Sequence, residues 1–206
     1  MGVEFAEVVR ARRMTRDFVE GPVPDAALRR IVAAARSAPS AGFAQGVDWL
    51  VLTGGKERAG FFDAVTDARF RAEPGAVSSL FRAGAVLLPV ADPEAYVRRY
   101  AEPDKALSDL AGRKAHQWEV AYWTVDAAFG VMAALLAAED EGLGALFFRL
   151  HGEPARLEGT FGIPNGRVLI GAVAVGLRPD GPRAPTGSPV RRQRRPFSDQ
   201  VHFDRW

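Results

Sequence analysis

The stretch of sequence that decides the fold is residues 115–144, AHQWEVAYWTVDAAFGVMAALLAAEDEGLG. Its composition predicts a helix from about residue 115 to 141, which Gly142 and Gly144 end. A helix on the surface of a globular protein is apolar along one stripe, whereas this one carries apolar residues on more than one face. We therefore expect a central helix that is buried in the molecule or shared with a second chain.

Shorter patterns on both sides of this helix predict the rest of the fold. Apolar runs bounded by Gly, Pro or Asp predict buried strands at 49–52, 85–88, 146–148 and 168–175. Helices are expected from residue 5 to about Met14, from Pro24-Asp25 to Ala38-Pro39, from about residue 56, and at 154–161. At 206 residues the chain needs only one core, so we expect a single α+β domain, residues 1–206.

Composition excludes several classes of protein and site. No apolar stretch approaches the roughly 20 residues of a membrane span, and the N-terminus lacks the pattern of a secretory signal. The absence of cysteine excludes disulfides, thiolate metal sites and thiol catalysis. We therefore expect a cytoplasmic protein. A net charge of only +2 gives no reason to expect nucleic acid or a membrane as a partner.

Positive charge gathers near the two ends of the chain. One cluster holds Arg10, Arg12, Arg13 and Arg16, and the other holds Arg191, Arg192, Arg194 and Arg195. The first could simply place cations at the negative end of a helix dipole. Guanidinium groups also bind phosphate oxygens bidentately, so the two clusters together would make a site for one phosphate group.

The second cluster lies in a basic, proline-rich tail at about 178–206. Repeated proline forbids regular helix there, so we expect the tail to run extended over a surface. A nonspecific basic arm for nucleic acid or anionic lipid is the alternative, but Pro and Phe interrupt its few charges.

The usual catalytic motifs are missing from the sequence. It has no P-loop, no Gly-x-Gly-x-x-Gly after a strand and no His-x-x-x-His pair. His116, His151 and His202 are scattered, so we expect structural histidines and no metal. A reaction that uses none of these groups borrows its chemistry from a cofactor.

Several motifs, in a fixed order, resemble those of one family. Residues 12–18, RRMTRDF, are similar to the Arg-Arg-Ser-x-Arg-x-Phe opening of the nitroreductase family, and 38–45, APSAGFAQ, follow at the usual distance. The start and end of that family's core helix resemble 122–128, YWTVDAA, and 137–144, AAEDEGLG. Its closing segments resemble 161–164, FGIP, 171–176, GAVAVG, 194–197, RRPF, and the terminal Trp206.

The resemblance implies an α+β fold with a central mixed β-sheet flanked by helices, in an intertwined homodimer with FMN at the subunit interface. Arg12 to Arg16, with Arg192 and Arg194, would contact the phosphate, the ribityl chain and the ring edge. The loop from Ser40 to Gln45 would pack on the flavin of the partner subunit, and 147–150 would place a backbone N–H near flavin N5. The expected cofactor-binding residues are Arg12, Arg13, Met14, Arg16, Ser40, Phe43, Gln45, Phe148, Arg149, Arg192 and Arg194.

The implied activity is that of an FMN-dependent oxidoreductase. Hydride would pass from NADH or NADPH through flavin N5 to a flat acceptor, a nitroaromatic, a quinone or similar, by ping-pong chemistry. No side chain is expected to be catalytic, although Arg16 would stabilise charge on the reduced flavin. Two alternatives remain: a flavin or deazaflavin dehydrogenase or biosynthetic enzyme, and a non-catalytic flavin-binding dimer with a degenerate pocket.

Several positions depart from the family pattern, and among them Phe147, Phe148 and Arg149 crowd a region that is often smaller. Met14 stands where Ser is usual, Phe43 where Asn is usual, and Gly46 where Pro is usual. Phe43 cannot make the hydrogen bonds of an amide, so it either stacks on a ring or fills the pocket.

Overall fold

A five-stranded sheet organises the computed structural model, which describes residues 4–66, 79–151, 154–181 and 191–206. The strands in this described part are β1 (Val47–Leu52), β2 (Ala85–Ala91), β3 (Gly144–Phe148), β4 (Val168–Leu169) and β5 (Ala172–Gly176). Their order is β1-β2-β5-β3, with β4 also paired to β2. All these pairings are antiparallel. Among the described residues, the mixed character expected of the sheet is confined to one parallel bridge, between Met14 and Ala145.

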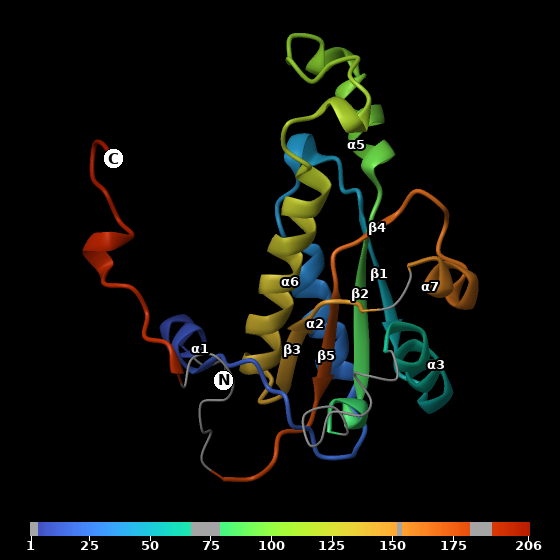
Figure 1. Ribbon diagram of the computed structural model, residues 1–206, viewed down its shortest axis with the longest axis vertical. Helices are drawn as coiled ribbons and strands as arrows, with labels where there is room; N and C mark the ends of the chain where they lie inside the picture. Colours follow the sequence, from blue (N-terminus) through green and yellow to red (C-terminus); the bar gives the residue numbers. More distant parts are fainter. Residues whose placement is uncertain (1–3, 67–78, 152–153, 182–190) are drawn as a thin grey trace.

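Helices cover both faces of the sheet, as Figure 1 shows: α2 and α6 lie on one side, and α3 and α7 on the other. Alternate residues of the inner strands supply the two cores. In β2, Val86 and Leu88 pack toward α3 and α7, whereas Ala85 and Leu87 pack toward α2 and α6. The helices labelled are α1 (Phe5–Ala11), α2 (Asp25–Arg36), α3 (Gly55–Val65), α5 (Pro93–Tyr100), α6 (Tyr122–Asp140) and α7 (Pro154–Phe161).

The central helix is confirmed, but it begins later than predicted. Residues 115–117 form a separate 3-10 turn, and α6 starts at Tyr122. Between the two, Trp118 is extended (φ −83°, ψ 126°) and buried, in a small aromatic cluster with Tyr96 and Trp123. Packing of the indole therefore holds the chain out of helical geometry. Phe129 and Met132 of α6 remain 49% and 43% exposed, so the helix still has an uncovered apolar patch.

Two further boundaries were wrong. The first helix ends at Ala11 rather than near Met14, because Arg12 is already extended (φ −51°, ψ 125°). The strand predicted over 168–175 is two strands, β4 and β5, separated at Gly171. Gly171 has φ +149°, and a Cβ there would lie 2.6 Å from Cε2 of Phe147. The backbone bends around that ring, so the strand cannot continue straight.

The tail does not pack on its own chain. All of residues 191–206 are exposed, and Figure 1 shows this segment standing away from the sheet. The expectation that it covers a surface is therefore not met within one copy of the chain. Residues 182–190, which include three of the tail prolines, lie outside the described residues.

Within the described ranges, no helix combines the length and the apolarity that crossing a membrane would take.

Candidate functional site

The segment from Arg12 to Arg16 runs along the edge of β3. Met14 pairs with Ala145, and the Thr15 N–H donates to the Ala145 carbonyl at 2.9 Å. This pairing is possible because α1 has already ended and the chain is extended. Phe148 and Arg149 close the same strand, roughly 10 Å further along at the usual rise per residue. The structure therefore brings two of the predicted segments to one edge of the sheet.

The two arginines that follow α1 have different surroundings. Nη1 of Arg13 turns back and donates to the carbonyls of Arg10 (2.5 Å) and Arg12 (3.0 Å), as expected for a cation at a helix end. Nη1 of Arg12 is buried and, among the described residues, has no hydrogen-bond partner. Leaving a charged N–H buried and unpaired is costly. Arg12 is therefore the side chain at this edge that lacks an acceptor such as a phosphate oxygen.

Arg16 and Phe148 complete this edge. Nη1 of Arg16 donates to the Met14 carbonyl at 3.4 Å, a weak contact. The Phe148 ring faces the core, where its centroid lies 6.2 Å from that of Phe61 in an edge-to-face arrangement. Only the backbone of Phe148 is thus available for a ligand at this edge. Arg149 is exposed.

The second predicted group, the loop from Ser40 to Gln45, is held by a buried carboxylate. Oδ2 of Asp126 accepts from the Ala41 N–H (2.8 Å) and from the Tyr96 hydroxyl (2.7 Å). Tyr96 is fully buried, and burial followed by the hydrogen bond to Asp126 raises its pKa, which keeps the hydroxyl protonated as a donor. The loop is therefore fixed to the first turns of α6.

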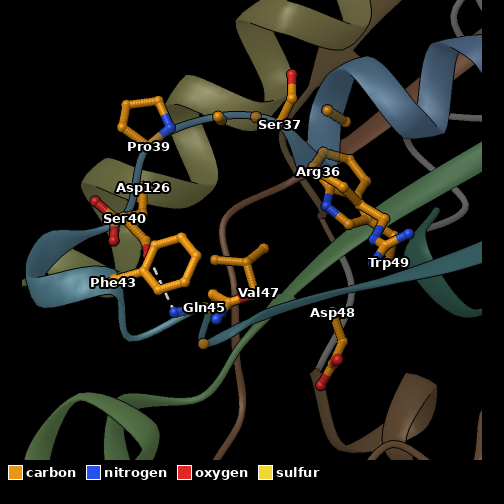
Figure 2. Close-up of a pocket in the computed structure, with 14 residues that line it drawn as sticks. Arg36, Ser37, Pro39, Ser40, Phe43, Gln45, Val47, Asp48, Trp49 and Asp126 are labelled. Carbon is orange, nitrogen blue, oxygen red and sulfur yellow. Dashed lines mark hydrogen bonds between the residues drawn. The ribbon is translucent and has the colours of Figure 1, made fainter. Parts of the chain in front are cut away.

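Two more hydrogen bonds brace the same loop. Nε of Arg99 in α5 donates to the Gly42 carbonyl at 2.7 Å, and Arg99 is itself paired with Asp104 at 2.6 Å. Within the loop, Oγ of Ser40 accepts from the Gln45 N–H at 3.0 Å, the dashed line in Figure 2. The Ser40 hydroxyl oxygen thus has a structural partner as well as a place in the predicted site.

The loop backbone is left-handed at three residues, Gly42 (φ +59°), Phe43 (φ +58°) and Gln45 (φ +50°). Phe43 is 73% exposed. Its ring borders a pocket of about 340 Å³ that also touches Trp49, Arg36 and Asp48 (Figure 2). The phenyl group does not fill this pocket of its own chain.

The structure explains the departure at Gly46. A Cβ at this position would lie 2.5 Å from Cε2 of Tyr96, the buried ring that donates to Asp126. The buried position of Tyr96, from which its hydroxyl donates to Asp126, therefore requires a residue without a side chain at position 46.

Sequence reasoning missed the residues that hold the loop: Asp126, Tyr96 and Arg99. A signal for Asp126 was present, because it is the one charged residue between Tyr122 and Ala138. Charged residues are rarely buried without a partner, so this carboxylate was a candidate anchor. Tyr96 and Arg99 carry no comparable signal.

The two halves of the predicted site stand at opposite ends of α6. The loop is tied to Asp126 near the start of this helix, whereas Ala145 follows its end. The helix from Asp126 to Asp140 spans roughly 20 Å along its axis at the usual rise per residue. Arg192 and Arg194 lie in the exposed tail. One copy of the chain therefore places the segment from Arg12 to Arg16 beside β3, the strand that ends at Phe148, and separates the Met14–Ala145 bridge from the loop of Ser40, Phe43 and Gln45.

Comparison with known proteins gives a family match and a set of similar structures. A model of the nitroreductase family matches residues 9–177. A search of curated proteins found no significant match.

Three solved structures illustrate the shared fold. A nitroreductase family protein from Clostridium difficile 630 has a TM-score of 0.72 at 18% identity, covering 99% of this chain and 100% of that one. One from Streptococcus pneumoniae TIGR4 has a TM-score of 0.69 at 17% identity, covering 97% and 99%. The NADPH:FMN oxidoreductase of Vibrio harveyi, complexed with NAD+, has a TM-score of 0.69 at 20% identity, covering 98% and 77%.

Proposed function

This chain belongs to the nitroreductase family, and from that premise we propose that it is an FMN-dependent oxidoreductase that takes electrons from NADH or NADPH. The observation that carries the proposal is the buried, unpaired Nη1 of Arg12 in the first motif that the family resemblance assigns to the FMN phosphate. A guanidinium group without an acceptor fits an anionic ligand, and a phosphate group supplies charged oxygens. The similar fold of an NADPH:FMN oxidoreductase supports the choice of cofactor and donor.

Residues at the β3 edge would hold most of the cofactor. We assign the phosphate to Arg12, with Arg13, Arg192 and Arg194 as further cations. Met14 and Arg16 would line the ribityl chain and the ring edge, where Arg16 would stabilise negative charge. Arg149 and the backbone of Phe148 would lie at the ring, since the Phe148 side chain packs on Phe61.

The remaining residues would come from a second copy of the chain. The loop and the β3 edge stand at opposite ends of α6, so a ring held at the β3 edge is out of reach of the loop of its own subunit. The uncovered patch of Phe129 and Met132 lies on the same helix. We therefore infer a homodimer in which Ser40, Phe43 and Gln45 of one subunit face the flavin held by the other.

The exposure of the tail also supports a homodimer. Residues 191–206 have no contact surface in their own chain that buries them, so we assign them to the partner subunit, which makes the dimer intertwined. In this arrangement residues 1–206 form a single domain, and its tail, from about residue 178, packs on the partner subunit.

When bound, FMN would supply the redox chemistry, the transfer of a hydride from NADH or NADPH through N5 to a flat acceptor by a ping-pong order. For a quinone acceptor, the two electrons and one proton of that hydride, with one further proton from solvent, give the hydroquinone. The chain's task is to orient the rings and exclude water from between them. Phe148 packs in the core and Phe43 stands in solvent, which supports an open site for nitroaromatic, quinone or similar flat acceptors.

The test is an absorption spectrum of the purified protein, followed by steady-state assays. We expect the bands of an oxidised flavin, released as FMN on denaturation, and oxidation of NADH or NADPH when menadione is supplied. Parallel double-reciprocal lines would support the ping-pong order. A colourless protein that cannot be reconstituted with FMN would refute the proposal.

A further inference from the structure

Phe43 combines two features that are rarely found together. Its ring is 73% exposed, and its backbone is left-handed at φ +58°. Residues with a bulky side chain seldom adopt this conformation, which is costly for any residue other than glycine. Exposure of a phenyl ring to water is also unfavourable. Neither the exposed ring nor the left-handed backbone stabilises the chain on its own, so both indicate that a ligand contacts the Phe43 ring.

The loop is built to keep the ring where it is. Asp126 fixes the backbone before Phe43 through the Ala41 N–H, and Arg99 fixes the Gly42 carbonyl. Ser40 holds the following turn by accepting from the Gln45 N–H. A loop braced on both sides of one residue cannot swing its side chain into the core. The ring is thus presented in advance, which lowers the entropic cost of stacking on it.

The surroundings of the ring suit a flat partner. Phe43 borders the pocket of about 340 Å³ that Trp49 and Val47 also line (Figure 2). An aromatic face beside an open pocket binds planar rings by offset or edge-to-face stacking. Asparagine, the usual residue here in the family, would offer hydrogen bonds instead.

We propose that Phe43 determines acceptor specificity by stacking on the flat ring of an aromatic acceptor held at the flavin of the partner subunit. This inference rests on the proposed function and adds the feature by which the acceptor is chosen. It also separates Phe43 from Arg12: the phenyl ring selects the acceptor, and the guanidinium holds the cofactor.

The test compares Phe43→Leu, Phe43→Tyr and the unaltered protein, each loaded with FMN. The binding probe is benzoate, a planar aromatic acid that cannot be reduced, titrated against the flavin absorbance. We expect Phe43→Leu to weaken benzoate roughly three- to tenfold, and Phe43→Tyr to restore it, because stacking is lost and regained. The Kd of FMN is measured for each variant, and the benzoate titrations are compared at saturating FMN, so that a change in flavin binding is separated from a change in benzoate binding.

Steady-state assays give a second reading. The KM for menadione should rise in Phe43→Leu by the same factor, and it should rise more than the KM for ferricyanide, which has no flat ring. Phe5→Leu is the matched control, because Phe5 is a similarly exposed ring, at 71%, on α1. Phe5→Leu should change neither the KM for menadione nor the KM for ferricyanide.

A stability measurement distinguishes this role from a structural one. Phe43→Asn should raise Tm, since asparagine tolerates the left-handed backbone better, while benzoate binding weakens as in Phe43→Leu. Unchanged benzoate affinity in Phe43→Leu, with FMN still bound, would overturn this inference and leave the proposed function intact. Failure of the unaltered protein to bind FMN would overturn both.

Discussion

Arg12 has a buried side-chain nitrogen, Nη1, that lacks a hydrogen-bond partner among the described residues. Replacing it with alanine removes the orphaned donor, so we expect the Kd of FMN to rise roughly tenfold to a hundredfold, the range of a charge-assisted hydrogen bond. Quenching of flavin fluorescence on titration measures this directly. Arg29→Ala, which removes an exposed arginine of α2, should leave the Kd alone. An unaltered Kd in Arg12→Ala would remove Arg12 from the phosphate site.

Tyr96 gives the stability of the fold a defined dependence on pH. Burial, and then the hydrogen bond to Asp126, raise its pKa above the 10.0 of a free tyrosine. Above about pH 10 the unfolded chain releases this proton and the folded chain keeps it. Stability should therefore fall as pH rises, by about 1.4 kcal/mol per pH unit from this group, and Tyr96 adds no slope below pH 10.

Urea unfolding at several pH values checks the role of Tyr96. Between pH 10 and 11 the free energy of unfolding of Tyr96→Phe should decline less steeply than that of the unaltered protein. Equal slopes would show that Tyr96 titrates alike in both states. At neutral pH the variant should be less stable, because Asp126 loses a donor.

Residue types in the sequence indicated much of the candidate site, but not the roles within it. The spacing of Arg12 and Arg13 predicted a basic group at a helix end. Only the structure shows that the Arg13 side chain donates to carbonyls at this helix end, whereas Nη1 of Arg12 is buried without a partner among the described residues. The sequence shows that residue 43 is phenylalanine, but it does not show the left-handed backbone. That conformation depends on hydrogen bonds between the loop and Arg99 of α5 and Asp126 of α6. Contacts between residues so far apart in the chain leave no local pattern.

At the scale of elements, periodicity located the helices and strands and erred where side chains from elsewhere intervene. The boundaries of α2 and α7 follow their own Pro and apolar spacing, and they were predicted well. The central helix was placed too early because Trp118 packs into an aromatic cluster. The last strand was left unbroken because nothing near Gly171 in the sequence reveals that Phe147 presses on it.

Gly171 is expected to be indispensable to the join between β4 and β5. Gly171→Ala would place a methyl group 2.6 Å from Cε2 of Phe147 at a positive φ, so we expect a loss of roughly 1–3 kcal/mol in the free energy of unfolding. Urea denaturation measures it. Gly60→Ala is the control: Gly60 lies in α3 with open space around it and should gain up to about 1 kcal/mol. Similar behaviour of the two variants would contradict this account of the bend.

At the scale of the whole molecule, the length of α6 is the reason for our proposal that a site built from both its ends is shared between subunits. This can be tested with two defective chains. Arg12→Ala damages the β3 edge, and Gly46→Val displaces the loop, because a side chain at 46 collides with Tyr96. In a mixed dimer, one of the two sites would receive both defects and the other neither.

Co-expression of the two variants should therefore restore flavin binding. With random pairing, half of the dimers are mixed, so roughly a quarter of all sites should recover normal affinity for FMN. Spectroscopic counting of tightly bound FMN after gel filtration provides the measurement. Two differently tagged copies of Arg12→Ala, treated in the same way, should recover none. Equal failure of the mixed sample would place the whole site within one chain.

The bare tail has a consequence for the life of the protein in the cell. Its large apolar side chains, Phe197, Phe203 and Trp206, are 70%, 75% and 101% exposed, and within residues 192–206 the only regular structure is the short 3-10 turn at Phe197–Asp199. Proteases cut such extended, uncovered segments first. A chain without a partner would thus lose residues 191–206 early, and with them Arg192 and Arg194. In the proposed dimer the partner subunit would cover this segment, so a copy with a partner should be cut there more slowly than a copy without one.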